Sequence, residues 1–238
     1  MPQPKAQVKA KANLQKNRLH ITVSGNINAK LLEKLYTDIR FCVADLKPGF
    51  QVLSDISQCQ LFYITSMPTY KKIIDFLIAQ RAGGIVRIIK QNNISCKQVI
   101  NLSERIGGYT PLYVQSEEEA EQRLEEIVPR NGIRLKLRHL LIAYDCPAGN
   151  GKGTIADISI SGCAVENATL PLPLDLVIEG SISFDQHPTF IGSVQLKARV
   201  VRTDGNRFAV HFLDLTEECK EQLFKRLAHE VSRARIDV

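Results

Sequence analysis

The sequence changes its pattern near residue 129, and this change divides the 238-residue chain into two parts that need different folds. Before this point, short apolar runs alternate with segments whose apolar residues recur every three or four positions. After it, runs of alternating apolar and polar residues follow one another, separated by turn signals. Pro129 disfavours a helix in the residue before it, and Asn131-Gly132 is a turn signal. We therefore predict an interdomain linker at residues 127–133.

The N-terminal part, residues 17–126, alternates strand and helix four times. This alternation predicts an α/β sandwich with a largely parallel sheet. A capping box with acidic residues opens the last helix at Ser116. The expected strands cover residues 18–24, 50–56, 84–90 and 111–115, and the expected helices cover 28–44, 68–82, 95–106 and a segment that begins at 116.

The C-terminal part, residues 134–238, predicts a small antiparallel β-barrel followed by a helix. Asp204-Gly205 is a hairpin signal between two of its strands. Leu223 and Leu227 are one turn apart in a final amphipathic helix, which we expect to pack on the barrel. The expected strands cover 134–144, 153–159, 174–183, 190–202 and 207–213, and the expected helix covers about 216–234.

The net charge of +6 comes from the N-terminal end of the chain. Residues 1–32 contain six basic residues and no acidic residue, and the basic and acidic residues of the remainder cancel. Residues 1–16 are therefore either a solvated basic arm or a first strand. A basic segment of this kind can contact nucleic acid or an anionic membrane. Because it has no interleaved aromatic residues, we expect no specific nucleic-acid binding.

Composition and spacing argue against several other classes of protein. No apolar run approaches the roughly 18 residues that span a bilayer, and the N-terminus has no apolar signal region, so we expect a cytoplasmic protein. The six cysteines form no C-x-x-C pair and have no histidine at metal-ligand spacing. Since we find no pair of nucleophile and base either, we expect no enzymatic activity, no metal and no cofactor.

The segment GNGKGT at residues 149–154 looks like a phosphate-binding loop but has the wrong spacing. Cys146 stands where that motif needs a glycine, and Gly153 stands where it needs serine or threonine. It also lies between two expected strands. We predict a flexible hairpin loop here.

Two short motifs flank this segment and have the chemistry to bind a guanine-containing anion. Arg130-x-x-x-Arg134 lies at the linker, and Asp157-x-Ser159-x-x-Gly162 ends the second expected barrel strand. Arginine can grip guanine O6 and N7 or clamp a phosphate. The aspartate accepts from guanine N–H groups, the serine donates or accepts, and the glycine allows close approach of the backbone.

On these motifs, residues 129–234 resemble a PilZ domain, the bacterial receptor module for cyclic di-GMP. The downstream run VQLKARVVRTDGNRFAVHFLDL and the terminal helix add to the resemblance. It implies that Arg130 and Arg134 hold the guanine edges and phosphates, while Asp157, Ser159 and Gly162 line the base pocket. Arg134-x-x-x-Arg138 is an overlapping copy of the first motif. Arg138 is therefore an additional candidate ligand residue.

The N-terminal part more faintly resembles a STAS-type domain, related to anti-sigma-factor antagonists. The resemblance rests on LHITVSGNI, VLSDISQCQLFYITS and the acidic helix after YVQSEEEAE. Antagonists of that family carry a phosphorylatable serine, and Ser66 in Ile64-Thr65-Ser66-Met67 holds the matching position. An alternative role for Ser66 is to cap the helix that opens at Pro68. We expect this domain to dock a protein partner.

Together these features predict a bacterial cyclic di-GMP effector. A ligand held by both linker and barrel is expected to reorient the first domain and so signal to an unidentified protein partner. Two alternatives stay open. One is a barrel without a working pocket that acts as a ligand-independent interaction module, and the other is an antagonist-like regulator switched by phosphorylation.

Overall fold

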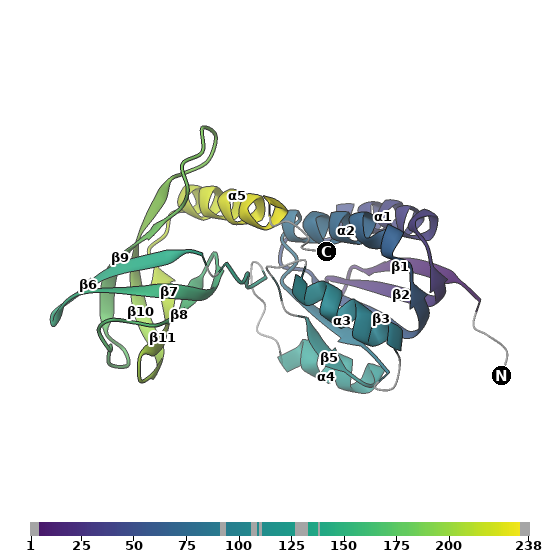
Figure 1. Ribbon diagram of the computed structural model, residues 1–238, viewed down its shortest axis with the longest axis horizontal. Coiled ribbons are helices and arrows are strands. Elements are labelled where there is room, and N and C mark those ends of the chain that lie inside the picture. Colours follow the sequence, from purple (N-terminus) through teal and green to yellow (C-terminus); the bar gives the residue numbers. More distant parts are fainter. Residues whose placement is uncertain are drawn as a thin grey trace. The chain divides into compact units, whose positions relative to one another are not determined.

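The computed structural model describes residues 5–90, 94–105, 109, 111–126, 133–137 and 139–233 (Figure 1). It divides into two compact units. The first comprises Met1–Ile133 with Ile236–Val238, and the second comprises Arg134–Arg235. Each unit has its own sheet and its own core.

The N-terminal unit is built on a five-stranded sheet in the order β1-β2-β3-β4-β5 (Figure 1). β1 is antiparallel to β2, and the other neighbours are parallel, as the strand–helix alternation predicts. The strands are β1 (Gln7–Asn13), β2 (Arg18–Ile27), β3 (Gln51–Phe62), β4 (Gly84–Ile88) and β5 (Leu112–Val114). Part of the basic N-terminal segment is thus a strand at the edge of the sheet.

Helices pack on both faces of this sheet. They are α1 (Ala29–Ala44), α2 (Met67–Ala79), α3 (Ile94–Arg105) and α4 (Glu117–Glu126). Alternation along β3 separates the faces: Val52 shares a cavity with side chains of α1 and α2, while Leu53 packs in a cluster with Leu124 of α4. The predicted cap of α4 forms, because the Glu119 N–H donates to Ser116 Oγ over 3.1 Å.

The C-terminal unit is a closed six-stranded barrel in the order β10-β11-β8-β7-β6-β9, with every pair antiparallel. The predicted antiparallel barrel is confirmed, but the predicted strand list is incomplete. The strands are β6 (Leu141–Cys146), β7 (Gly149–Ser159), β8 (Gly162–Glu166), β9 (Val177–Ser183), β10 (Ser193–Asp204) and β11 (Arg207–Leu213). β8 was not predicted, because only Ile160 and Ser161 separate it from β7.

The glycine-rich segment at 149–154 is the first half of β7, so the prediction of a hairpin loop was wrong. Its glycines make room for neighbouring side chains. A Cβ on Gly151 would lie 2.3 Å from the Tyr144 ring, and one on Gly153 would lie 2.4 Å from Val165. Tyr144 in turn donates its hydroxyl to the Leu170 carbonyl over 2.7 Å. Close packing inside the barrel, rather than loop flexibility, accounts for these glycines.

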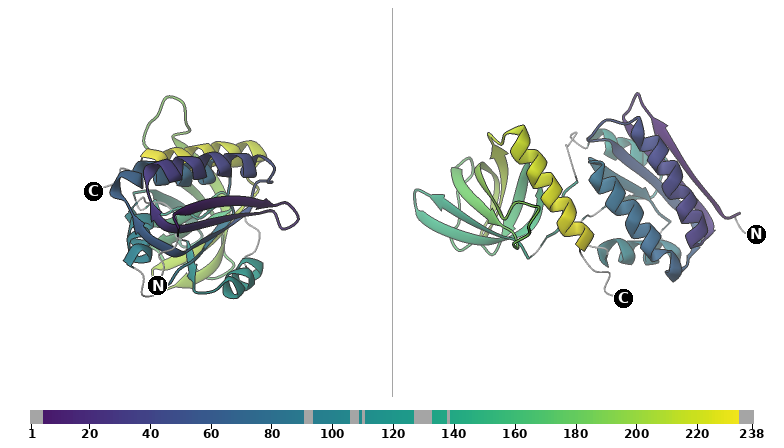
Figure 2. Two further views of the ribbon diagram at one scale, coloured as in Figure 1. Left: turned by 90° about the vertical axis from the view of Figure 1, so that its right-hand side faces the viewer. Right: turned by 90° about the horizontal axis from the view of Figure 1, so that it is seen from above.

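The terminal helix α5 (Glu217–Arg233) packs on the barrel unit, as predicted (Figure 2). It buries an apolar stripe that includes Leu223 and Leu227. It also buries Arg226, whose Nη2 donates to the Asp185 carbonyl over 2.8 Å and lies 2.6 Å from Glu230 Oε1. This guanidinium also faces the ring of Phe184, with 5.1 Å to the ring centroid.

Candidate ligand-binding site

The segment that follows the domain junction pairs with the end of β7. Leu135 and Ile158 form an isolated antiparallel bridge, in which each N–H donates to the other carbonyl, over 2.8 Å and 2.9 Å. Both side chains are buried in the barrel unit. Because side chains alternate across a strand, Arg134 and Asp157 next to this bridge are only partly buried. Ser159, on the other side of Ile158, is buried. The bridge therefore fixes Arg134 beside the outer side of β7.

This register brings the two predicted motifs together. Arg134 Nη1 lies 2.5 Å from Asp157 Oδ1, so one residue of each motif forms a charge-assisted hydrogen bond with the other. The two side chains remain 36% and 30% exposed. A ligand arriving from solvent can therefore reach both groups.

Ser159 and Gly162 are close by but face protein atoms. Ser159 is 3% exposed, and its hydroxyl donates to the Gly162 carbonyl over 3.2 Å. This bond holds the tight connection between β7 and β8. A Cβ on Gly162 would lie 2.2 Å from the Val210 carbonyl oxygen of β11. The barrel itself thus needs serine and glycine here, whatever they contribute to a ligand.

A buried thiol lies next to the ion pair. Burial and, to a smaller extent, the charge of Asp157 raise the pKa of Cys163 to about 12, although Arg134 opposes the increase. Cys163 is therefore a neutral thiol at physiological pH, and a weak nucleophile. It is fully buried in the core of the barrel unit.

Two of the predicted arginines, Arg130 and Arg138, lie outside the described residues. Lys136 belongs to neither motif and was not predicted as a ligand residue. The bridge register places it opposite Asp157, and it is exposed. The alternation of Arg134, Lys136 and Arg138 in the sequence was the signal that pointed to it.

The candidate phosphorylation site in the N-terminal unit has a different environment. Ser66 is fully buried, and its hydroxyl donates to the Ile27 carbonyl over 3.3 Å. It occupies the position before α2 but makes no side-chain capping bond, so the expected capping hydrogen bond is absent. In this conformation a kinase has no access to the Ser66 hydroxyl.

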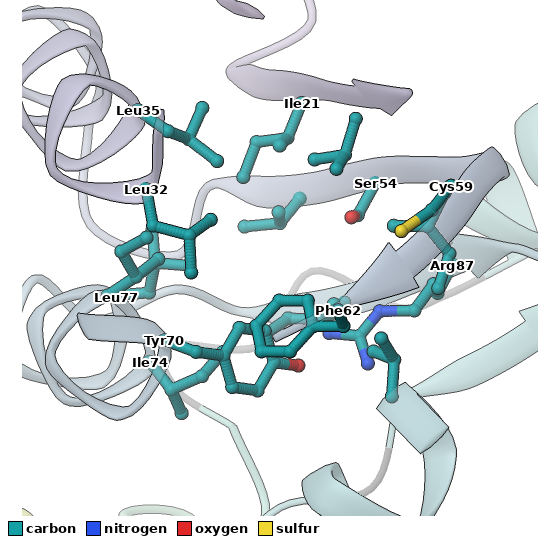
Figure 3. A pocket seen from close by; sticks show the side chains of 16 residues that line it. Ile21, Leu32, Leu35, Ser54, Cys59, Phe62, Tyr70, Ile74, Leu77 and Arg87 are labelled. Atoms are coloured by element: carbon teal, nitrogen blue, oxygen red, sulfur yellow. The ribbon is translucent and has the colours of Figure 1, made fainter. Parts of the chain in front are cut away.

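The N-terminal unit also has an internal cavity of about 50 Å³ between the sheet and its helices (Figure 3). Its lining is mostly aliphatic and aromatic, with Ser54 and Arg87 as polar exceptions. The Arg87 Nη2 donates to the Tyr109 hydroxyl over 3.1 Å. The volume is that of about two water molecules, which is far below the size of a nucleotide site.

The described part of the chain was compared with what a metal site and a membrane-spanning helix require. No three histidine, cysteine or acidic side chains there gather closely enough to hold a metal ion. None of the described helices combines the length and the apolar character needed to cross a bilayer. None of the six cysteines, all of which lie in the described part of the chain, forms a disulfide bond.

Comparison with known proteins assigns the C-terminal unit. The family model for the PilZ domain matches residues 130–229. The PilZ domain of CeSA from a cellulose-synthesizing bacterium is 16% identical, with 42% of this chain and 98% of that chain covered and a TM-score of 0.33. The PilZ domain of YcgR from Escherichia coli, solved with c-di-GMP, is 15% identical, with 40% and 82% covered and a TM-score of 0.33.

The N-terminal unit has a counterpart among solved structures as well. The anti-sigma factor antagonist SpoIIAA in its unphosphorylated form is 12% identical, with 51% of this chain and all of that chain covered and a TM-score of 0.38. A search of curated proteins gives no match. Since the family model covers both motifs and most of the barrel unit, residues 130–229 of this chain are a PilZ domain.

Proposed function

We propose that this protein is a receptor that binds cyclic di-GMP at the Arg134–Asp157 pair and passes the signal to a protein partner through its N-terminal unit. The observation that carries the proposal is the half-exposed ion pair, which joins the two PilZ motifs at the end of β7. On this proposal the protein acts by binding, in the cytoplasm, and has no catalytic step.

Guanine has hydrogen-bonding groups for both members of this ion pair, so it can replace the bond that they make to each other. Its O6 and N7 accept from the two arms of a guanidinium, and its N1–H and N2–H groups donate to a carboxylate. When the Arg134–Asp157 bond opens, both charged groups therefore find new partners on the same base. Neither is left desolvated and unpaired, which would cost about 1–3 kcal/mol or more.

The position of Arg130 and Arg134 in the chain suggests how ligand binding is passed on to the N-terminal unit. Arg134 is the first residue of the barrel unit. Arg130 precedes it in the sequence, and the Asn131-Gly132 turn signal lies between them. We propose that residues 127–133 are the linker and that Arg130 adds a second guanidinium to the bound ligand. Ligand binding then changes the conformations open to the linker, and the N-terminal unit presents its partner surface differently.

Calorimetric titration with cyclic di-GMP tests the assignment of the site. Wild type is expected to bind, while Arg134→Ala and Asp157→Ala each lose a charge-assisted contact worth about 1.5–3 kcal/mol, or roughly 10- to 150-fold in affinity. Arg199→Ala removes an exposed arginine of β10 as a matched control and should bind like wild type.

Two results would overturn the proposal in different ways. Binding that both site substitutions leave unchanged would place the ligand elsewhere on the protein. No heat with any guanine nucleotide would make the barrel a ligand-independent interaction module.

A further inference from the structure

β1 is one of the two edge strands of the N-terminal sheet, and among the described strands it pairs only with β2. Its outer side meets no other strand among the described residues. An unpaired edge presents a row of backbone N–H and C=O groups, to which an extended segment from another protein can add. The side chains of such an edge then decide which segments it accepts.

One face of this edge borders a polar hollow of about 540 Å³. Lys9 lies opposite Thr22 in the β1–β2 register, and Lys11 lies opposite His20, so these four side chains share a face. Asn13 and Leu14 complete the end of the hollow. The opposite face of β1 is apolar, with Val8 buried.

The two lysines are available for a partner. Neither Lys9 nor Lys11 forms an ion pair within the described part of the chain, and both are exposed. The nearby acid Glu121 of α4 is already held by Lys16 and Arg18, with N···O distances of 2.7 Å and 2.6 Å.

His20 adds no charge at neutral pH. Burial and, to a smaller extent, the charges of Arg18 and Lys16 lower the pKa of His20. The carboxylates of Glu121 and Glu117 partly oppose this decrease. Lys9 and Lys11 therefore set the sign of the charge along this face of the edge.

A second copy of the chain is a poor occupant of this edge. Antiparallel pairing of two β1 strands about Ala10 would place Lys9 of each directly opposite Lys11 of the other. Like charges at directly opposed positions destabilise a sheet, and opposite charges there stabilise it. The same lysines that repel a copy of β1 are therefore complementary to a strand with carboxylates at alternate positions.

We propose that the β1 edge docks an extended acidic segment of a partner protein. Its carboxylates face Lys9 and Lys11, and its alternate residues are apolar and continue the face of Val8. This inference names the kind of partner that the proposed function requires. It does not depend on nucleotide binding, so its test is carried out on the full chain without cyclic di-GMP, and a failed nucleotide titration would leave it standing.

The test uses a short peptide of alternating Glu and Val and a counterpart with Lys in place of Glu. The Glu peptide should bind wild type, more weakly as salt rises, and protect the amides of β1 from hydrogen exchange. Two opposed charge pairs predict about tenfold weaker binding to Lys9→Glu/Lys11→Glu. That variant should instead bind the Lys peptide. Lys30→Glu/Lys34→Glu, which changes the same charge on exposed positions of α1, should behave like wild type.

Three outcomes with the Glu peptide would overturn the proposal. The Glu peptide fails to bind wild type, or it binds both charge variants equally, or it binds without protecting the β1 amides. A single-stranded oligonucleotide that binds in its place with the same lysine dependence would assign the surface to nucleic acid and would also overturn it.

Discussion

Among its described residues, the barrel unit contains two arginine–carboxylate pairs with similar N···O distances and opposite environments. Arg226 and Glu230 of α5 are 2.6 Å apart and are 0% and 6% exposed. Arg134 and Asp157 are 2.5 Å apart and are 36% and 30% exposed. The buried pair has no route to a ligand, whereas the exposed pair can exchange its partner for one. Accessibility, rather than the presence of the pair, separates a structural ion pair from a candidate binding site.

The largest expected effect comes from breaking the buried pair. Glu230→Ala leaves the Arg226 guanidinium buried without its carboxylate, and we expect a loss of about 3–5 kcal/mol in the free energy of unfolding. Urea unfolding measures it. The double variant Arg226→Met/Glu230→Leu removes both charges and should recover most of the loss. A Glu230→Ala variant as stable as wild type would show that the buried pair is not structural.

A smaller loss is expected from Gly162→Ala, which tests the scaffold beneath the exposed pair. The new methyl would press on the Val210 carbonyl, so we expect about 2 kcal/mol of destabilisation. Gly192→Ala is the matched control, because a Cβ there meets nothing within 4 Å. If both variants unfold at the same urea concentration as wild type, the close approach of β8 to β11 is not a constraint on the fold.

Breaking the exposed pair should hardly change stability. Without ligand, Arg134→Ala is expected to cost no more than about 1 kcal/mol in urea unfolding, because solvent screens a half-exposed ion pair. The same substitution should weaken nucleotide binding by roughly 10- to 150-fold. A stability loss as great as that of Glu230→Ala would remove the distinction between the two pairs.

The smallest expected effect concerns a third ion pair, in the N-terminal unit. Hydrogen bonds from Arg18 and Lys16 lower the pKa of Glu121 to about 2. Because the folded pKa lies below the value near 4.3 of an unfolded chain, this contribution is fully present above about pH 5 and is lost as pH falls through 2. The urea midpoint of wild type should therefore approach that of Glu121→Gln as pH is lowered from 6 to 3. A difference between the two that stays constant over this range would contradict the pKa assignment.

The sequence by itself determined the order of elements and the location of the motifs. Apolar periodicity is a local property, so it located the helices and most strands within a few residues, and it separated the α/β part from the barrel. Turn chemistry at Asp204-Gly205 located the β10–β11 hairpin in the same way. The spacing of the PilZ motifs was also readable, because it depends on residue types alone.

Tertiary structure alone decided which side chains meet and which reach solvent. The bridge between Leu135 and Ile158 brings the side chain of Arg134 within ion-pair distance of Asp157. No local sequence pattern encodes that register. Pairing with β6 makes the glycine-rich segment a strand, and the packing of the N-terminal unit buries Ser66. Contacts between residues far apart in the chain fix burial and register, so both become visible only when the whole unit has folded.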